Sequence, residues 1–591
     1  MRPMVEWRNA TETGPPCAFA RPLPARRGLT RVRAVKPAPD DLYRTAIRLH
    51  QQGKTREAAA LYDAVLAQRP LHAGALHLKG VLALQAGDYR AAATLIERSL
   101  ELEPRHGLAL ANLGVAYRAQ DRFDAAIALF RRALVLDPAD VNTLANLGQT
   151  LVRAGQIEEA VVWCRRALDR DPNRLGLQSS LLFAQNYLAE SAPLEMTADA
   201  RRVGSLFAAA NPPRTHHPND PDPARQLRVG LVSGDFRAHP VGRFLMAVVP
   251  ALDPKTLELF AYATSRDEDE ITAQLRQAVP HWNNVTDLPG RALTAQIVAD
   301  KIDVLVDLSG HTASHRLAVF AGKPAPVSFT WLGYFATTGL SAIDYVLANR
   351  WVIPETETAQ WVEQVWRMPD TYLCFTAPPA APAVSPLPAA TNGSVTFGCF
   401  NNFNKLTGRT LAAWSALLAA TPGSRLILRS SGGYPDGMVE ALGERLAAAG
   451  IDRARVRIDG KIADYAAHLQ SYAEIDIALD PFPYNGGTTT VEALFMGVPV
   501  LVKSGDRYVA HMGESILHNA GLPEWIAPDE AGYATLGAQL AADRPALAAL
   551  RAGLRQRMLA SPLFDAPHFA SNFEDALRGM WQVWCAAQDR G

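Results

Sequence analysis

The chain has 591 residues, enough for three or four compact domains at roughly 150 residues each. Its 59 Lys and Arg residues balance its 59 Asp and Glu residues, which argues against a protein whose main task is to coat DNA or RNA, because such proteins carry net or clustered positive charge. Hydrophobic residues make up 48% and charged residues 20% of the chain, so we expect a globular protein and exclude wholesale disorder.

The first 38 residues are rich in proline and arginine and contain only two acidic residues, Glu6 and Glu12. They lack the apolar segment that a secretory signal requires. We expect residues 1–38 to form a disordered basic tail. An organellar transit peptide is the alternative, since such peptides are also rich in arginine and poor in acids, but no amphipathic period is present.

A repeat of 34 residues follows this tail. The interval relates prolines, alanines, leucines and glycines: Pro70, Pro104, Pro138, Pro172; Ala58, Ala92, Ala126, Ala160; Leu66, Leu100, Leu134, Leu168; Gly80, Gly114, Gly148. Each unit is predicted to form a helix, a turn and a second helix that ends at the proline. The pattern resembles the tetratricopeptide repeat, so we expect four units over residues 39–172, linking helices to residue 210, and a superhelix with a concave inner surface.

Asn112 and Asn146 occupy equivalent positions in two of these units, each just before a Leu-Gly pair. An amide offers both a donor and an acceptor, so asparagines on the concave side can hold the backbone of an extended peptide. The alternative is that both side chains only face solvent. Spacing alone does not separate these interpretations, and Arg44 and Leu78 stand at the matching places in the first two units.

Residues 211–226 are rich in proline, histidine and aspartate and are predicted to be a linker. Beyond them, short apolar runs alternate with helical stretches, a pattern typical of parallel sheets covered by helices on both faces. We predict one α/β domain over 227–376, a Pro/Ala connector over 377–394 and a second α/β domain with closing helices over 395–591. The expected strands are Leu227–Ser233, Val304–Leu308, Val327–Leu332, Tyr345–Leu347, Val395–Phe400, Arg425–Arg429, Val456–Ile458, Ile475–Leu479 and Val498–Val502.

The most informative segment, NGGTTT at residues 485–490, follows a predicted strand that ends at Asp480 and opens a helix. Glycines let backbone N–H groups approach a ligand, the helix N-terminus supplies partial positive charge, and threonine hydroxyls add donors, which together favour a diphosphate. Ordinary helix capping is the alternative, but capping alone does not require two glycines and three threonines. The candidate binding residues are Asn485, Gly486, Gly487, Thr488, Thr489 and, for ribose hydroxyls, Glu492.

The segment GCFNNFNK follows another predicted strand and ends in Lys405. A lysine at the carboxyl end of a strand, facing the same cleft, can neutralise the charge on a departing diphosphate. Asn402 in the same loop can hold a phosphate oxygen or a base edge. An exposed, salt-bridging lysine is the competing interpretation, and spacing barely separates the two.

In the first α/β domain, His239 lies in the loop after the opening strand, at the expected mouth of the cleft. A histidine there can accept a proton or bind a substrate hydroxyl, although a lone loop histidine is more often structural. His311 follows another strand and adds a polar group to the same rim. Leu332 and Gly333 lie at the end of a third strand and are expected to form a wall of the pocket.

Four segments together are similar to those of the nucleocytoplasmic protein O-GlcNAc transferases, including their bacterial relatives and the plant SPINDLY branch. They are DFRAHPVG (235–242), PAPVSFTWLGYFATTG (324–339), FGCFNNFNK (397–405) and LDPFPYNGGTTTVEALFMGVPV (479–500). The resemblance covers the repeats and both α/β domains, about residues 39–590. It implies the two-domain GT-B fold and a metal-independent transfer with inversion at the anomeric carbon.

The resemblance also implies roles for single residues. His239 matches the active-site histidine and Lys405 the lysine at the diphosphate, so these two are the catalytic candidates. Thr488 and Thr489 match threonines that bind the diphosphate, and His468 matches a histidine that contacts the nucleotide.

Other positions match less directly or depart from the family. His281 aligns with another donor-site histidine only across a gap, and Arg316 falls at a polar position on the rim of the cleft. The animal enzymes carry histidine at Gly487, glutamine at Asn402 and aspartate at Glu492. Glycine at 487 resembles the bacterial and plant branches, and at least one plant relative uses GDP-fucose.

We therefore expect a protein O-glycosyltransferase that moves GlcNAc from UDP-GlcNAc to Ser or Thr of polypeptides held by the repeats. The alternatives are the same fold with GDP-fucose or UDP-glucose as donor, and a repeat scaffold with an inactive transferase body. The expected partners are a protein or peptide acceptor and the nucleotide sugar, with no cofactor, metal, nucleic acid or membrane. A cytoplasmic location is expected because the five cysteines are dispersed and no apolar run approaches the ~20 residues of a membrane helix.

Overall fold

The structure, a computed structural model, describes residues 37–430, 437–460, 462 and 464–588. The basic tail expected over residues 1–38 therefore lies outside the described residues as far as residue 36. Contacts divide the chain into two compact units, one ending at Ala75 and the other beginning at Leu76. This division falls within the repeats. The sequence instead predicted that the repeats and their linking helices form one domain that ends at residue 210.

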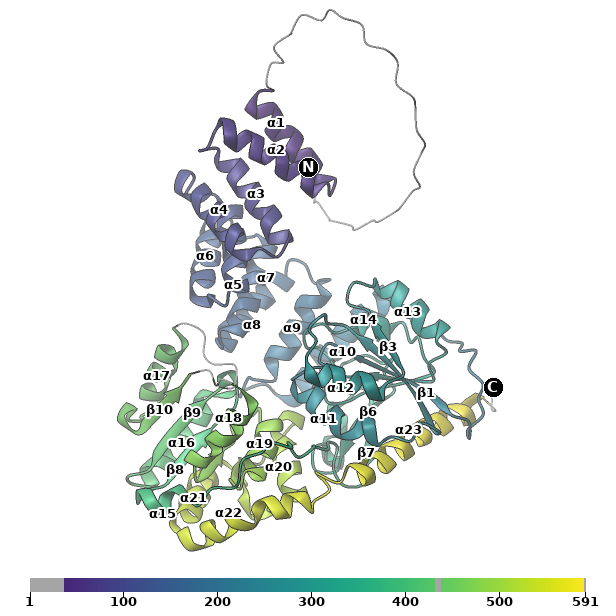
Figure 1. The fold of residues 1–591 in the computed structure, drawn as a ribbon, viewed down its shortest axis with the longest axis vertical. Coiled ribbons are helices and arrows are strands. Elements are labelled where there is room, and N and C mark those ends of the chain that lie inside the picture. The colour runs from purple at the N-terminus through teal and green to yellow at the C-terminus, as the bar shows by residue number, and fades with distance from the viewer. Residues whose placement is uncertain (1–36, 431–436, 461, 463, 589–591) are drawn as a thin grey trace, which may run out of the picture. The chain divides into compact units, whose positions relative to one another are not determined.

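Helix pairs form the repeats, as the 34-residue interval predicts, and Figure 1 shows those from α3 onward stacked in chain order. In the compact unit that ends at Ala75, α1 and α2 pack together around Ala46, Ala58 and Tyr62. In the compact unit that begins at Leu76, a Cβ on Gly114 of α5 would lie 2.7 Å from the ring of Phe130 of α6. The small residue that recurs in the repeats therefore sets how closely the paired helices approach. The helices are α1 (Pro39–Gln51), α2 (Thr55–Gln68), α3 (Ala73–Gln85), α4 (Tyr89–Leu102), α5 (Gly107–Ala119), α6 (Phe123–Leu136), α7 (Val141–Arg153) and α8 (Ile157–Leu168).

Two further helices, α9 (Leu175–Gln185) and α10 (Pro193–Ala210), lead into the first α/β domain, here called the N-lobe. Its parallel strands lie in the order β3-β2-β1-β4-β5-β6-β7. The elements are β1 (Leu227–Ser233), α11 (Pro240–Val248), β2 (Leu257–Ala263), α12 (Glu270–Ala278), β3 (His281–Asn284), α13 (Gly290–Ala299), β4 (Val304–Asp307), α14 (Leu317–Ala321), β5 (Val327–Thr330), β6 (Tyr345–Asn349), the 3-10 helix η2 (Glu355–Gln360) and β7 (Gln364–Met368).

The second α/β domain, here called the C-lobe, repeats this arrangement with strands in the order β10-β9-β8-β11-β12-β13. In each lobe the strand order reverses beside the first strand, and the carboxyl ends of strands at such a point bind ligands. The elements are α15 (Pro388–Asn392), β8 (Thr396–Cys399), the 3-10 helix η3 (Phe403–Lys405), α16 (Gly408–Ala420), β9 (Arg425–Arg429), α17 (Met438–Ala448), β10 (Val456–Asp459), α18 (Tyr465–Gln470), β11 (Ile477–Leu479), α19 (Thr488–Phe495), β12 (Val500–Lys503), α20 (Tyr508–Asn519), β13 (Ile526–Ala527) and α21 (Glu530–Ala542).

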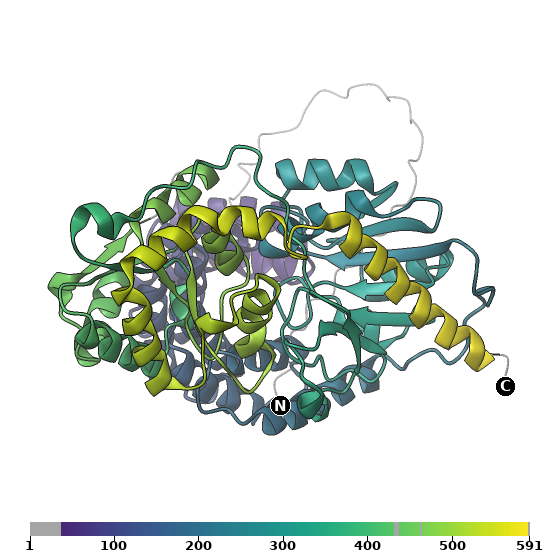
Figure 2. The same cartoon turned by 90° about the horizontal axis from the view of Figure 1, so that it is seen from below.

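The two C-terminal helices connect the lobes. Helix α22 (Arg544–Leu559) packs against α19 in the C-lobe, and α23 (Ala566–Gln588) returns to the N-lobe, where it packs against α11, β5 and β7. Figures 1 and 2 show these yellow helices running from one lobe to the other. Trp581 on α23 is fully buried, and its indole N–H donates to the carbonyl of Asp222 at 3.0 Å.

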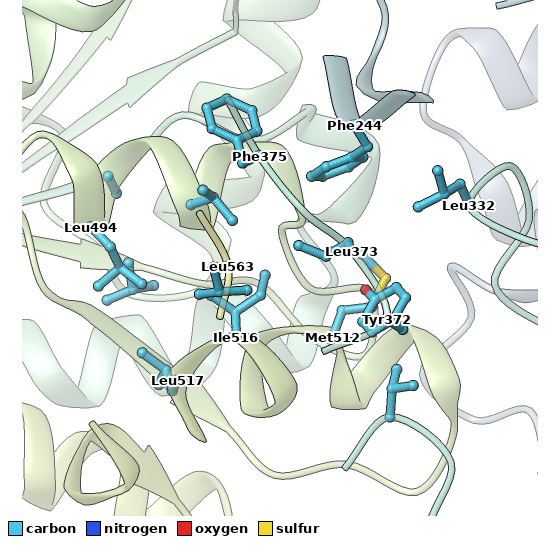
Figure 3. Close-up of a cluster of buried hydrophobic side chains, with 14 of the residues drawn as sticks. Phe244, Leu332, Tyr372, Leu373, Phe375, Leu494, Met512, Ile516, Leu517 and Leu563 are labelled. Atoms are coloured by element: carbon cyan, nitrogen blue, oxygen red, sulfur yellow. The ribbon is translucent and has the colours of Figure 1, made fainter. Parts of the chain in front are cut away.

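An apolar core joins the lobes where the chain passes from one to the other. Phe375 packs edge-on against Phe244 of α11 at a ring separation of 6.0 Å, and its N–H donates to the carbonyl of Leu563 at 2.8 Å. Figure 3 shows these side chains together with Leu373, Tyr372 and Met512 of α20. Burial of this cluster favours a defined arrangement of the lobes around the space between their strand ends.

The predicted fold class is confirmed: helical repeats precede two parallel α/β domains. The sequence did not single out β2, β3, β7 or β13. Strand β3, with the sequence HWNN, and β7, with QVWRM, are polar strands at the two edges of the N-lobe sheet, and β13 has only two residues. Such strands lack the continuous apolar run that marks a central parallel strand.

Candidate active site

A cavity of about 1050 Å³ lies where the carboxyl ends of the strands of both lobes meet the repeats. Segments that follow β1, β4, β5, β8 and β11 line it, together with residues of α5, α7 and α9. The predicted site residues His239, Leu332, Gly333, Asn402, Lys405, Gly487, Thr488 and Thr489 are all in its lining. The structure thus brings together positions from both lobes that the sequence related only through the expected cleft.

The turn before α19 is organised by a buried carboxylate. Asp480, which follows β11, accepts a hydrogen bond from the backbone N–H of Gly486 at 2.6 Å and one from the amide of Asn401 at 3.4 Å. A Cβ on Gly486 would lie 2.5 Å from the hydroxyl of Thr490, so only glycine fits there. Asn485 is also buried and accepts from the N–H of Gly513 at 3.3 Å. Asn485 and Gly486 therefore hold the turn in place, rather than lining the cavity.

The first residues of α19 face the cavity. The hydroxyl of Thr489 donates to Asn401 Oδ1 at 3.0 Å. The hydroxyl of Thr488 is buried and has no hydrogen-bond partner among the described residues. Buried polar atoms are nearly always paired, so an unpaired hydroxyl at a helix N-terminus is the donor that an anionic ligand needs.

Lys405 ends η3 and reaches the same turn. Its Nζ donates to the carbonyl of Asn485 at 2.7 Å and to Asn401 Oδ1 at 3.3 Å, and it lies 4.4 Å from the ring centre of Tyr484. Burial lowers the pKa of Lys405 to about 8, opposed by the nearby Asp480. Burial also raises the pKa of Asp480 to about 7, against the lowering effect of the Gly486 N–H and of Lys405. A desolvated ammonium is a strong stabiliser of negative charge.

Glu492 and His468 lie outside the cavity lining. The carboxylate of Glu492 is buried and accepts from the hydroxyl of Tyr465 at 2.8 Å and from His468 Nε2 at 3.1 Å. His468 packs against Phe400, which does line the cavity, at a ring separation of 6.1 Å. The guanidinium of Arg243 lies 3.6 Å from the ring centre of Tyr465. In this arrangement protein donors, rather than open space, face both oxygens of Glu492.

His239 is the N-cap of α11 on the N-lobe side of the cavity. The N–H of Val241 donates to His239 Nδ1 at 3.4 Å, which places the proton of the neutral ring on Nε2. Asp235 Oδ2 lies 3.6 Å from Nδ1. Burial lowers the pKa of His239, and the nearby Asp235 opposes this. The neutral ring can therefore donate through Nε2. Acceptance of a proton at Nε2 requires the other tautomer, with Nδ1–H directed at Asp235.

His311 connects the N-lobe to the repeat region. Its Nε2 donates to the carbonyl of Thr338 at 2.9 Å, so Nδ1 accepts from the hydroxyl of Ser179 on α9, also at 2.9 Å. Burial lowers the pKa of His311 to about 3, so it stays neutral and holds α9 beside the cavity.

His281 and Arg316 are not brought to the cavity. His281 lies on the edge strand β3, stacks on Phe260 at 4.1 Å and bonds Glu258 at 2.8 Å through Nε2. Its position at the far edge of the sheet, two strands from β1, explains why it is absent from the lining. Arg316 donates to the carbonyls of Val285 and Thr286, both at 2.7 Å, and so has a local structural role.

The two asparagines of the repeats are already hydrogen-bonded within the protein. Asn112 on α5 bonds His77 Nε2 at 3.0 Å, and Asn146 on α7 accepts from Arg118 at 3.1 Å. Both are half-buried and lie one repeat apart, as predicted. Neither lines the cavity, but Arg118 does.

Several cavity residues were not singled out by the sequence analysis. Asn401 joins Lys405, Thr489 and Asp480 in one network, and Tyr484 covers Lys405. Asn401 and Tyr484 lie within motifs that the sequence had already identified as parts of the site. Their individual roles depend on contacts with residues distant in sequence, which the motifs do not specify. Arg118 carries no motif at all.

Within the parts of the chain that the structure describes, no group of three or more His, Cys, Asp or Glu side chains is arranged to hold a metal ion. The same residues contain no helix both long and apolar enough to span a bilayer. The cysteines at 164, 374, 399 and 585 are buried and form no disulfide bond within the described part of the chain.

Sequence patterns of known families match most of the chain. The pattern of glycosyl transferase family 41 matches residues 206–376 and 387–573. Tetratricopeptide repeat patterns match residues 43–89, 77–141 and 117–182. The site residues of both lobes thus lie within the glycosyltransferase match.

Individual proteins show the same likeness. The probable UDP-N-acetylglucosamine–peptide N-acetylglucosaminyltransferases SPINDLY of Petunia hybrida and Arabidopsis thaliana are each 36% identical, over 68% and 69% of this chain but only 44% and 45% of their own lengths. The chain therefore spans less than half the length of these relatives. A solved mutant of the Thermobaculum terrenum O-GlcNAc transferase is 34% identical with a TM-score of 0.81, covering 87% of this chain and 98% of that one.

Proposed function

Since this chain belongs to glycosyl transferase family 41, we propose that it transfers N-acetylglucosamine from UDP-N-acetylglucosamine to serine and threonine hydroxyls of polypeptides. One observation carries the proposal above the others. The ammonium of Lys405, which bonds the carbonyl of Asn485 in the turn before α19, and the unpaired hydroxyl of Thr488, the first residue of α19, both line a cavity large enough for a nucleotide sugar. The similar proteins described above are named as a probable UDP-N-acetylglucosamine–peptide N-acetylglucosaminyltransferase and an O-GlcNAc transferase, which supports this choice of donor and acceptor.

The donor diphosphate would bind at the N-terminus of α19. Thr488, Thr489 and the backbone N–H groups of the first turn supply donors, and Lys405 supplies a full positive charge. Asn402 lies on the same wall and is available to the nucleotide.

The transfer would be a single displacement. The acceptor oxygen forms a bond to the anomeric carbon as the bond from that carbon to the diphosphate oxygen breaks, on the opposite face, so the configuration inverts. Negative charge grows on the leaving UDP, and Lys405 with the α19 N-terminus stabilises it. We propose that this protein charge replaces a divalent cation. The hydroxyl proton leaves as the new bond forms, and His239 is the candidate to bind that hydroxyl or take the proton.

The acceptor would reach this cavity along the repeats. Residues of α5, α7 and α9 form part of the lining, so a polypeptide on the inner face of the repeats enters the site directly. For Asn112 and Asn146 to hold its backbone, they must exchange their present partners, His77 and Arg118.

Substitution of Lys405 tests the proposal. With UDP-[³H]GlcNAc and a mixture of Ser- and Thr-containing peptides, we expect Lys405→Ala to lower the transfer rate by roughly 10²–10³-fold, because it removes the main stabilising charge. Lys503→Ala is the matched control, since Lys503 is a partly buried lysine of the same lobe that does not line the cavity. The rate should be unchanged in EDTA.

Other outcomes would redirect the proposal. Transfer from GDP-fucose or UDP-glucose, with none from UDP-GlcNAc, would replace the donor. Equal transfer by wild type and Lys405→Ala would contradict the assigned site. Binding of polypeptides without transfer from any of these donors would indicate a scaffold.

A further inference from the structure

Three helices of the repeat region contribute a polar wall to the cavity, here called the repeat wall. It consists of Arg118 on α5, Gln149 and Arg153 on α7, and Ser179 and Ser180 on α9. Its two arginines are its only charged residues. Lys405 and the start of α19, which the proposed function assigns to the diphosphate, belong to the C-lobe part of the same lining.

Arg118 is the unusual member of this wall. Its guanidinium donates to Asn146 Oδ1 at 3.1 Å and to Gln149 Oε1 at 3.5 Å, both neutral amide oxygens. Among the described residues it forms no ion pair, whereas Arg153 is paired with Asp121 at 2.6 Å. Burial lowers the pKa of Arg118, and the nearby Arg153 lowers it further. A half-buried cation next to a second cation, without a carboxylate of its own, is costly unless an anion comes to it.

The cavity as a whole has an excess of positive charge. Its lining contains Arg118, Arg153, Arg237 and Lys405 but only one carboxylate, Asp235. Burial lowers the pKa of all three histidines in the lining, to about 3 for His311 and about 4 for His315, and it also lowers the pKa of His239. The complete chain is neutral, so this excess is local. Asp121 balances the charge of Arg153, but neither this ion pair nor a diphosphate at Lys405 accounts for Arg118.

We propose that Arg118 selects acceptor polypeptides that carry an aspartate or glutamate near the glycosylated Ser or Thr. This inference rests on the proposed function, because it assigns the occupant of the repeat wall as the acceptor. The planar guanidinium presents paired N–H donors that match a carboxylate, and its present amide partners are weaker acceptors that a carboxylate can displace. A phosphorylated side chain offers the same chemistry and is distinguished by the experiment.

Affinity selection provides the test. Full-length protein loaded with UDP is immobilised and exposed to a library of peptides with one central Ser and randomised flanks, and the bound peptides are sequenced. We expect Asp and Glu to be enriched over Asn and Gln at a fixed distance from the Ser. A peptide with that residue should bind about tenfold more tightly than its amide counterpart, as a charge-assisted hydrogen bond predicts.

Three variants make the test specific. Arg118→Met, which retains most of the side-chain length, should abolish the acidic preference, and Arg118→Lys should retain part of it. Arg131→Met is the matched control, because Arg131 lies on α6 of the same repeat in an exposed pair with Glu159. Thermal unfolding and UDP affinity check that the Arg118 variants remain folded.

The outcomes separate this inference from the proposed function. Acidic enrichment that Arg118→Met abolishes supports the inference even if another sugar donor is used. GlcNAc transfer with no acidic preference, or with a preference that survives in Arg118→Met, overturns the inference and leaves the proposed function intact. A library arm with phosphoserine that binds in preference to Asp and Glu would also overturn it.

Discussion

Two titratable side chains on opposite sides of the cavity set the expected pH range of the reaction. Burial lowers the pKa of His239, so the ring is still neutral at pH 6.5, the ordinary pKa of histidine. Lys405 has a pKa of about 8 and loses its charge above that pH. For the free enzyme we therefore predict that kcat/KM falls above about pH 8 and, on the acid side, only below pH 6.5.

Steady-state rates across this range check the prediction, and Lys405→Arg serves as the control. An arginine remains charged, so the decline near pH 8 should disappear even if the maximal rate is lower. A decline that is identical in both proteins would show that another group controls the basic limb.

Asp480 contacts Asn401 of the cavity wall without lining the cavity itself, so we assign it a positioning role in the proposed transfer. It orders the Gly486 N–H and Asn401, and its charge favours the protonated form of Lys405. We predict that Asp480→Asn weakens UDP binding about tenfold and moves the basic limb of kcat/KM to lower pH, because Lys405 loses a nearby negative charge. Calorimetric titration with UDP and the pH profile measure the two effects.

Asp476 at the other end of β11 provides the matched control. It is equally buried and accepts from the N–H groups of Ala389 and Thr396, both at 2.8 Å, but it does not touch the α19 turn. Asp476→Asn should lower the stability of the C-lobe while the pH profile stays in place. A shift of the limb in both variants would mean that destabilisation, rather than positioning, causes it.

At the scale of elements, glycine sets how closely α10 approaches the N-lobe. A Cβ on Gly204 of α10 would lie 1.8 Å from the carbonyl oxygen of Gly339, and one on Gly339 would lie 1.9 Å from the carbonyl oxygen of Ala200. Backbone cannot yield as a flexible side chain does. We predict that Gly204→Ala lowers the free energy of unfolding by roughly 1–3 kcal/mol, as forced overpacking does.

Chemical denaturation measures this change, with Gly553→Ala as reference. Gly553 lies within α22, and a Cβ there would meet nothing within 4 Å. Alanine should stabilise that position by up to about 1 kcal/mol through its higher helix propensity. Equal effects of the two substitutions would contradict the close-approach explanation.

At the scale of the whole molecule, the last repeat contacts the loop that carries Lys405. The amide of Asn404 donates to the carbonyl of Val152 at 3.1 Å, and a Cβ on Gly155 would lie 2.5 Å from the ring of Phe403. The repeats therefore support η3 directly. We predict that Gly155→Ala displaces this loop and lowers both UDP affinity and transfer rate several-fold.

Gly87 is the control for this variant, because it occupies the same turn as Gly155, two repeats earlier in the chain. Both glycines have positive φ, 74° for Gly155 and 79° for Gly87, so alanine costs about 1 kcal/mol in backbone strain at each. Nothing lies within 4 Å of a Cβ on Gly87. Gly87→Ala should destabilise without loss of UDP affinity. If Gly155→Ala behaves identically, the contact has no functional effect.

The sequence by itself determined the helix pairs and the two parallel sheets. The 34-residue interval, the buried strands and the turn from β11 into α19 are each encoded within a few residues, because periodicity, glycine and capping act locally. For the same reason Lys405, His239 and the threonines at 488 and 489 were identified as candidates from their motifs. The polar edge strands β3 and β7 lacked such a signal, and His281 was assigned to a cleft that it does not reach.

Only the tertiary structure decided which of these residues meet. Lys405 bonds a carbonyl 80 positions away, and Asp480 lies beneath a turn whose order also depends on Asn401. Arg118 belongs to the cavity solely because α5 and α7 stack beside the lobes. Such contacts depend on strand order and on the packing of one domain against another, which are non-local, and no local pattern in the chain specifies them.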